Sequence, residues 1–281
     1  MPDSSIPRAE LHTPKELLAI AEELFNSGDE KVLRAVILEA ITALEAYVSN
    51  RVFPTLESKL DPLLVKWLEE RTRTDFDSRL DTFVPVAIGR QIDKRNHLWS
   101  DYKDAKAIRN RVTHSGRRVT RDEAMFVLRT VFAWLAFMGS TIEVELSLLA
   151  LKKFIESSKM RVPTNTTLRE TDVIKLVKQY FESSRSSVAK VEVPIRENMR
   201  ADLVLFFENY SILVETKFVV DQIFEEAMRH AIQQTLRMME GTRLDRGVII
   251  LFSNDSVPET FSKPYLVGNG RISVIGIQFP R

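Results

Sequence analysis

The chain has 281 residues, of which 44% are hydrophobic and 28% charged, and its formal net charge is +1. It contains no cysteine, which excludes disulfides, thiolate metal sites and a cysteine nucleophile. The N-terminus lacks a signal-peptide pattern, and no apolar run approaches the roughly 18 residues of a membrane span. These absences predict a cytoplasmic protein with no membrane association. Because domains average about 150 residues, the length predicts two domains.

The first 156 residues have the apolar spacing of helices. Thr13-Pro14 forms an N-cap and first-turn pair, and Thr120 with Glu123 forms a capping box for a later helix. A broad apolar surface between residues 32 and 52 predicts a helix at the centre of a bundle. The predicted helices cover 14–25, 32–52, 59–73, 78–93, 97–114, 121–138 and 141–157, with the last two continuous or kinked near Gly139. We therefore expect an all-α bundle.

The pattern changes at residues 157–167, which are polar, contain one proline and lack periodicity. We predict a linker there, between a helical domain at 1–156 and a second domain at 168–281. The second domain alternates helical and β-rich segments: a helix at 168–182, strands at 188–195, 200–207 and 211–219, a helix at 222–240, and strands at 246–253 and 271–279. This α-β-β-β-α-β-β order predicts an α/β mixed sheet with helices on its faces.

One predicted strand, 211–219, carries two charged side chains on one side. Glu215 and Lys217 share that side because side chains alternate along a strand. A tight turn at 208–210 pairs this strand with the preceding one and brings Asp202 towards the same end. Two carboxylates suit Mg²⁺, which can activate water, and a neighbouring ammonium can stabilise the charge that develops on a phosphodiester. The alternative is an edge-strand ion pair beside a turn acid.

The spacing of the acids resembles the motif of the PD-(D/E)XK nuclease superfamily, which has a restriction-endonuclease-like fold. Asp202 is followed by twelve residues and then by Glu215-Thr216-Lys217. The resemblance covers about residues 165–281. It implies that Asp202 and Glu215 bind Mg²⁺ or Mn²⁺ and that Lys217 is catalytic. Family members often add a glutamine from the next helix and an acid from the first helix; the matching residues are Gln234, with Gln233 second, and Glu170 as a metal ligand, with Glu182 second. The usual proline before the aspartate is replaced by Ala201.

A second group of polar residues lies late in the helical domain, at Arg109, Asn110 and His114. A histidine can act as a general acid or base near neutral pH, and arginine can hold a phosphate. Five residues turn a helix by about 140°, so Asn110 and His114 are stacked whereas Arg109 and His114 are not. A composite site needs the helix end or a second copy of the chain. Around the motif, a dense positive cluster can contact phosphates; it consists of Arg109, Arg111, Arg117, Arg118 and Arg121. The alternative is a solvated loop between helices.

The R-N-x-x-x-H motif in a helical bundle resembles the HEPN superfamily, over about residues 15–145. An acid in an earlier helix, matched here by Glu45, is also frequent. The resemblance implies a homodimer through the helical domain, with catalytic roles for Arg109, Asn110 and His114 in metal-independent RNA cleavage. Many members of the superfamily are only binding or dimerisation modules.

Together the two resemblances predict a metal-dependent nuclease acting on DNA or RNA, in the manner of a prokaryotic antiviral defence effector. Two alternatives stay open. One is a HEPN endoribonuclease whose C-terminal domain is a degenerate binding module. The other is a non-enzymatic module that binds nucleic acid or protein.

Overall fold

A computed structural model describes residues 12–71, 76–115, 117–157, 170–184, 188–196, 199–206, 211–219, 223–240, 242, 244, 246–253, 256–268 and 271–278. The chain divides into two compact units, Met1–Ser140 and Thr141–Arg281, which we call the helical unit and the sheet unit. Among the described residues, no helix combines the length and the apolar character that crossing a membrane requires.

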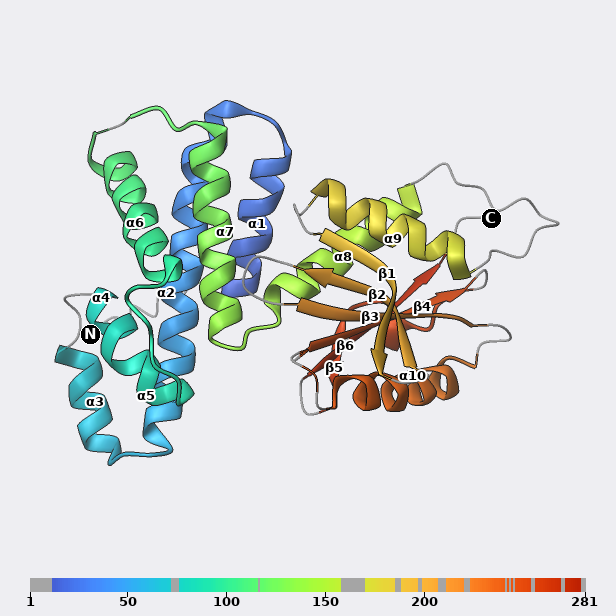
Figure 1. The fold of residues 1–281 in the computed structure, drawn as a ribbon. Coiled ribbons are helices and arrows are strands. Elements are labelled where there is room, and N and C mark those ends of the chain that lie inside the picture. Colours follow the sequence, from blue (N-terminus) through green and yellow to red (C-terminus); the bar gives the residue numbers. More distant parts are fainter. Residues whose placement is uncertain are drawn as a thin grey trace, which may run out of the picture. The chain divides into compact units, whose positions relative to one another are not determined.

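The helical unit is built around one long helix (Figure 1). α2 contacts most of the other helices of the unit, as its broad apolar surface predicts. The main helices are α1 (Pro14–Asn26), α2 (Leu33–Glu57), α3 (Pro62–Arg71), α6 (His97–Ser115) and α7 (Arg121–Phe137), with a 3₁₀ turn, η1 (Glu30–Val32), before α2. Both predicted N-terminal signals are confirmed: capping boxes open α1, through Thr13 and Glu16, and α7, through Thr120 and Glu123.

Two helix predictions in this unit are wrong in detail. α2 does not end near Val52 but continues through Pro54 to Glu57, because Phe53 and Leu56 are buried and hold the last turns. The segment predicted as one helix over 78–93 is instead three short pieces: α4 (Phe76–Ser78), the π-helical η3 (Arg79–Phe83) and α5 (Val84–Ile88). Gly89, with a φ of +69°, ends α5 in the left-handed conformation that glycine adopts readily.

The sheet unit contains one mixed sheet of six strands in the order β1-β2-β3-β4-β6-β5. Neighbouring pairs β1–β2, β2–β3 and β5–β6 are antiparallel, whereas β3–β4 and β4–β6 are parallel. The elements run α8 (Ile142–Ser157), α9 (Glu170–Ser184), β1 (Val188–Arg196), β2 (Met199–Phe206), β3 (Ser211–Phe218), α10 (Phe224–Met239), β4 (Arg246–Ser253), η4 (Glu259–Phe261), β5 (Tyr265–Val267) and β6 (Ile272–Gln278). The predicted mixed sheet is confirmed, and β5 is an addition that the sequence did not predict.

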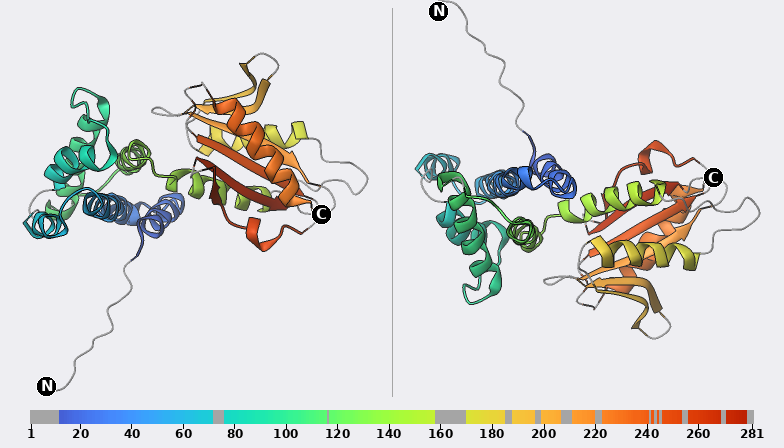
Figure 2. Two further views of the ribbon diagram at one scale, coloured as in Figure 1. Left: turned by 90° about the horizontal axis from the view of Figure 1, so that it is seen from below. Right: turned by 90° about the horizontal axis from the view of Figure 1, so that it is seen from above.

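Helices cover both faces of this sheet, with α10 on one face and α8 and α9 on the other (Figure 2). We name the two buried clusters after their helices. The α9-side core includes Val177, Phe181, Leu205, Val214 and Ile250. The α10-side core includes Ala231, Met238, Leu213, Ile249 and Val274. Each strand in the middle of the sheet therefore contributes alternate side chains to two cores, which fixes its register.

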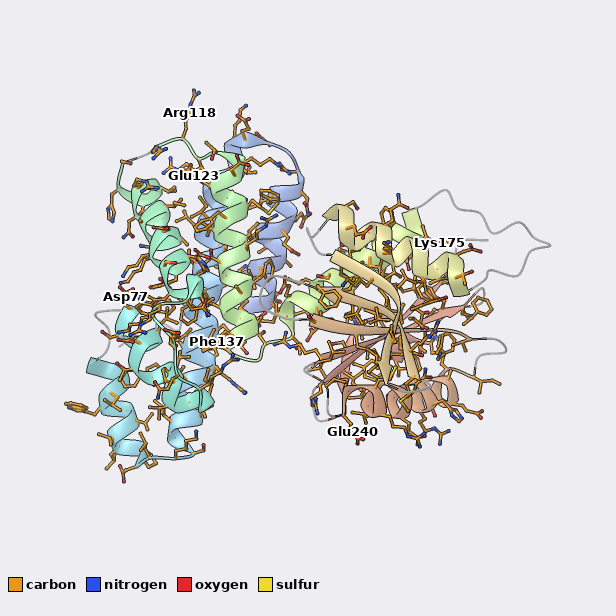
Figure 3. The ribbon with its side chains drawn as sticks, viewed as in Figure 1. Asp77, Arg118, Glu123, Phe137, Lys175 and Glu240 are labelled. Atoms are coloured by element: carbon orange, nitrogen blue, oxygen red, sulfur yellow. The ribbon has the colours of Figure 1, made fainter. Side chains whose placement is uncertain are left out.

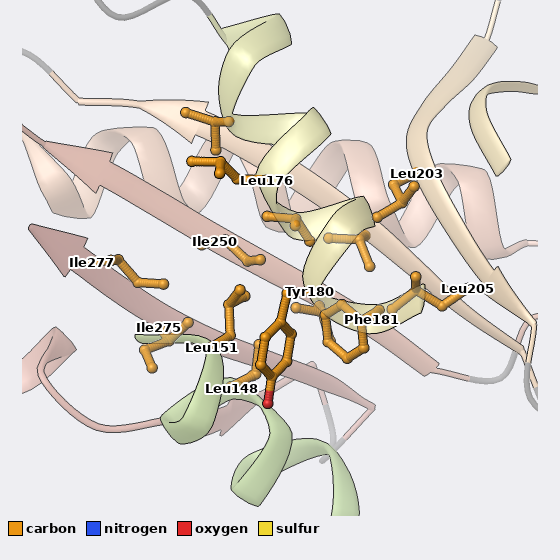
Figure 4. Packing of buried hydrophobic residues seen from close by; sticks show 14 of the residues in the cluster. Leu148, Leu151, Leu176, Tyr180, Phe181, Leu203, Leu205, Ile250, Ile275 and Ile277 are labelled. Carbon is orange, nitrogen blue, oxygen red and sulfur yellow. The ribbon is translucent and has the colours of Figure 1, made fainter. Parts of the chain in front are cut away.

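The predicted domain boundary requires correction. The sequence prediction assigned residues 141–157 to the helical domain, but α8 belongs to the sheet unit. Its buried residues Val144, Leu148, Leu151 and Ile155 join the α9-side core, where Leu148 and Leu151 lie beside Tyr180 and the strand residue Ile275 (Figure 4). The boundary lies at 140/141, next to Gly139 with its φ of +81°. Most of the predicted linker lies outside the described residues.

Candidate functional site

β3 carries a buried acid and a partly exposed amine on one face. Leu213 belongs to the α10-side core, so Glu215 and Lys217, two and four residues further along, face the same side. The Glu215 side chain is 0% exposed and the Lys217 side chain 29% exposed, and Lys217 Nζ lies 2.8 Å from Glu215 Oε1. Since burying a carboxylate is costly unless a cation compensates it, this pair is the main electrostatic feature of the strand.

The third predicted residue, Asp202, lies where β2 separates from β3. The ladder between the strands runs from Phe206↔Ser211 to Leu203↔Val214, and Asp202 and Glu215 are the residues that follow the last pair. The Asp202 carboxylate occupies the place of the missing backbone partner, because its Oδ2 accepts a hydrogen bond from the Thr216 backbone N–H at 2.7 Å. This nitrogen is the one that links Glu215 to Thr216. The structure therefore brings Asp202 to the backbone of the Glu215–Lys217 segment.

β1 and β2 both change face at the level of Asp202. On β2, Leu203 is in the α9-side core whereas Ala201 is in the α10-side core. On β1, Ala189 is in the α9-side core whereas Val193 packs against the α10-side core. Residues an even number apart share a face in a regular strand, so each strand rotates between these positions. Asp202 lies at this rotation, and its side chain reaches the backbone of β3.

Glu192 is a residue at this rotation that the sequence interpretation missed. The pairs Val191↔Leu203 and Val193↔Ala201 place it opposite Asp202. Its φ of +49° is left-handed, which is uncommon for a residue other than glycine and costs about 1–3 kcal/mol. No sequence signal marks it, because a glutamate in an alternating strand ordinarily predicts regular β geometry. The strained backbone allows β1 to follow the rotation of β2.

The predicted accessory residues are not brought to this group. Gln233 and Gln234 are exposed on α10 and directly precede Thr235, whose side chain lies against Gly247. Gly247 pairs with Leu213, two residues before Glu215, so the glutamines lie towards the beginning of β3. Glu182 is exposed on α9, the helix on the opposite face, with its Oε1 3.8 Å from Lys178 Nζ.

The third predicted metal ligand, Glu170, is the first residue of α9, and its side chain lies outside the described part of the chain. Within the described residues, no group of three or more histidine, aspartate or glutamate side chains has a metal-binding arrangement. Mg²⁺ commonly takes only one or two protein carboxylates and completes its coordination with water and phosphate. By type, the carboxylates of Asp202 and Glu215 are donors that Mg²⁺ and Mn²⁺ accept.

In the helical unit, the second predicted group lies on the last turns of α6. Arg109 Nη1 donates to the neighbouring Asn110 Oδ1 at 3.4 Å, and His114 is exposed one helical turn after Asn110. The end of α6 is held against α2 by Arg34, whose Nη2 donates to the Val112 carbonyl at 3.0 Å. Glu45 is half-buried on α2, and within the described residues it has no hydrogen bond to the three motif residues. The structure thus keeps the motif on one helix end.

α6 is also anchored at its middle by a carboxylate from α4. Asp77 accepts hydrogen bonds from Tyr102 Oη at 2.6 Å, from Lys106 Nζ at 2.7 Å and from Lys103 Nζ. Burial raises the pKa of Asp77, but the hydrogen bonds from Lys103, Lys106 and Tyr102 outweigh it and lower the pKa to about 2. The helix that carries the Arg109–His114 motif is therefore fixed by a charged contact on the turns that precede the motif.

The arginine cluster around this motif is partly neutralised. Arg111 and Arg117 both lie near Glu123 Oε1, at 3.9 and 3.5 Å. Arg121 donates to the Phe25 carbonyl and lies over the Phe25 ring. Arg118 extends from the same end of the unit, close to the Glu123 end of α7 (Figure 3). The surface available to an anion is smaller than the count of arginines suggests.

Comparison of the chain with protein-family models, with curated proteins and with solved structures finds no match.

Proposed function

We propose that the sheet unit hydrolyses phosphodiester bonds of nucleic acid in a reaction that depends on Mg²⁺ or Mn²⁺. The observation that carries the proposal is that Asp202 accepts hydrogen bonds from Thr216, the residue between Glu215 and Lys217, at the point where β2 leaves β3. The Glu215 carboxylate is fully buried beside the Lys217 ammonium, and the Asp202 carboxylate is hydrogen-bonded to the next backbone amide. The motif spacing, which resembles that of PD-(D/E)XK nucleases, supports the same reaction.

Each residue has a role that follows from its position. Asp202 and Glu215 hold the divalent cation, because hard carboxylate oxygens are its preferred ligands. When bound, that ion activates water and stabilises charge on the phosphodiester. Lys217 is partly exposed, with 29% of its side chain accessible, and its ammonium orients the attacking water and stabilises the charge of the pentacoordinate phosphorane. The half-buried position of Asp202 keeps the group open to a substrate.

The decisive experiment is a cleavage assay of the full chain on single- and double-stranded DNA and RNA, with Mg²⁺, Mn²⁺ or EDTA. We expect cleavage with metal and none in EDTA. Lys217→Ala should lower the rate about 100- to 1,000-fold, the usual cost of removing one group that stabilises transition-state charge. Lys175→Ala is the matched control, because Lys175 is an exposed lysine on α9, and it should leave the rate unchanged. Cleavage in EDTA that Lys217→Ala does not affect would contradict the proposal.

A second candidate function is metal-independent RNA cleavage by the helical unit. The observation that favours it is the Arg109–Asn110 contact one helical turn from the exposed His114. A histidine in this position can exchange protons with an RNA 2′-hydroxyl, and Arg109 can hold the phosphate. Because the three residues come from one helix end, a complete site in this proposal needs a second copy of the chain. RNA cleavage in EDTA that His114→Ala abolishes would favour this function over the first.

A further inference from the structure

Thr216 makes two contacts with the same oxygen of Asp202. Its backbone N–H donates to Asp202 Oδ2 at 2.7 Å and its side-chain hydroxyl donates to the same oxygen at 3.0 Å. The residue is 0% exposed. Among the described residues, hydrogen bonds to Asp202 reach Oδ2 only. One carboxylate oxygen is therefore fixed by two donors from β3, whereas the other accepts no hydrogen bond from the described residues.

The hydroxyl at this position is not required by packing. Thr216 lies on the side of β3 that also carries Ile212, Val214 and Phe218, all apolar residues that contribute to the α9-side core. A valine has the same β-branched shape and would suit such a surface. What threonine adds to the shape of valine is a hydroxyl, and this hydroxyl donates the hydrogen bond to Asp202 on β2.

We propose that Thr216 is a positioning residue for cation binding, which holds Asp202 Oδ2 so that Oδ1 is presented to the Mg²⁺ or Mn²⁺ ion. This inference rests on the proposed function. It identifies the middle residue of Glu215-Thr216-Lys217 as a functional part of the site rather than a spacer. The backbone ladder between β2 and β3 ends before Asp202, where β1 and β2 rotate. The two hydrogen bonds from Thr216 hold the Asp202 side chain at this point. Groups that orient a ligand in this way often govern metal affinity.

The test is the affinity of the full chain for Mn²⁺ alone, measured by calorimetry. Thr216→Val removes the hydroxyl but keeps the shape and the backbone N–H, and we expect it to weaken Mn²⁺ binding about 10- to 100-fold. Thr216→Ala is a second removal and should weaken binding at least as much. Thr216→Ser restores the hydroxyl and should restore the affinity. Cleavage by Thr216→Val should return towards the wild-type rate at high Mn²⁺, because the defect is in ion binding and the Lys217 ammonium is retained.

Thr235→Val is the matched control. Thr235 is an equally buried threonine in the same unit, but among the described residues its Oγ1 has no hydrogen-bond partner. This variant should leave Mn²⁺ affinity unchanged. Wild-type protein that binds Mn²⁺ with the same affinity as Thr216→Val overturns the positioning role and leaves the proposed nuclease function intact. Wild-type protein that binds no Mn²⁺ and cleaves nothing overturns the proposed function, and the positioning role with it.

Discussion

The two units build their candidate sites from charged residues in opposite environments. In the sheet unit, Glu215 is fully buried and its lysine neighbour mostly so, and Asp202 is fixed by donors from the next strand. In the helical unit, His114 is exposed at a helix end, and the arginines near it lie at 3.5 Å or more from their acidic neighbour. A strand between two cores can hold a charge out of water, whereas the end of a helix presents it to water.

This difference in burial determines how much each contact contributes to stability. A buried charge that loses its partner destabilises strongly, whereas an exposed ion pair contributes little. The units can be followed separately during unfolding, because all three tryptophans, Trp67, Trp99 and Trp134, lie in the helical unit. Tryptophan fluorescence thus reports the helical unit alone, and far-UV circular dichroism reports both units.

The largest effect on stability is expected from Lys217→Met. Removing the ammonium leaves the Glu215 carboxylate buried without the cation at 2.8 Å, which should lower the free energy of unfolding of the sheet unit by about 3 kcal/mol. Urea unfolding followed by circular dichroism measures the loss. The fluorescence transition of the helical unit should not move.

The double variant Glu215→Gln/Lys217→Met is the control for this interpretation. It removes both charges, so the sheet unit should regain most of the lost stability even though the proposed site is destroyed. If the double variant is as unstable as Lys217→Met, the contribution of the pair is packing rather than charge. In that case the burial of charge would not explain why the Glu215–Lys217 pair stabilises its unit more than the exposed ion pairs of the helical unit do.

An intermediate effect is expected from Asp77→Asn, which concerns a partly buried carboxylate in the helical unit. Hydrogen bonds from Lys103, Lys106 and Tyr102 outweigh burial and lower the pKa of Asp77 from 3.8 to about 2. A lowered pKa means that the ionised form stabilises the fold above about pH 4, and that this contribution is lost as the pH falls towards 2. The shift corresponds to about 2 kcal/mol. Fluorescence-detected urea unfolding should show Asp77→Asn destabilised near neutral pH and converging with wild type in acid.

Asp81→Asn provides the comparison for that measurement. Asp81 also contacts a lysine, with Lys94 Nζ at 2.7 Å from its Oδ2, but both side chains are more than a third exposed. We expect little change in the stability of the helical unit at any pH. A loss equal to that of Asp77→Asn would show that exposure does not distinguish these two carboxylates.

Much of the sheet unit follows from the sequence because its strands are simple. The apolar run of β4 predicts a buried strand with the observed bounds, 246–253, and counting back from a tight turn places Asp202 level with Glu215. The packing of α8 does not follow in the same way. Its apolar face has helical spacing, and spacing predicts that a face will be buried without specifying whether a bundle or a sheet buries it. The short strand β5 carries too few residues to show a period.

The candidate site was predictable only in its charged residues. Their types and spacing identify Asp202, Glu215 and Lys217, but the rotation at Asp202 depends on a left-handed φ at Glu192 that no local pattern indicates. The two hydrogen bonds from Thr216 depend in turn on that rotation, because in a regular ladder its backbone N–H would pair with β2. Gln234 has the expected place along the sequence, yet its exposed position on α10 depends on which side of the helix meets the sheet.

The smallest effect is expected from Arg111→Gln, in the arginine cluster of the helical unit. Arg111 Nη2 lies 3.9 Å from Glu123 Oε1 and its side chain is 47% exposed, so its loss should change the free energy of unfolding by less than about 0.5 kcal/mol. Glu123→Ala should cost about 1 kcal/mol, because it also removes the capping box of α7. Both values come from urea unfolding followed by tryptophan fluorescence. If Arg111→Gln lowers the free energy of unfolding as much as Lys217→Met does, burial does not determine how much these ion pairs stabilise the protein. The exposed arginine cluster would then have a structural role that its distances do not indicate.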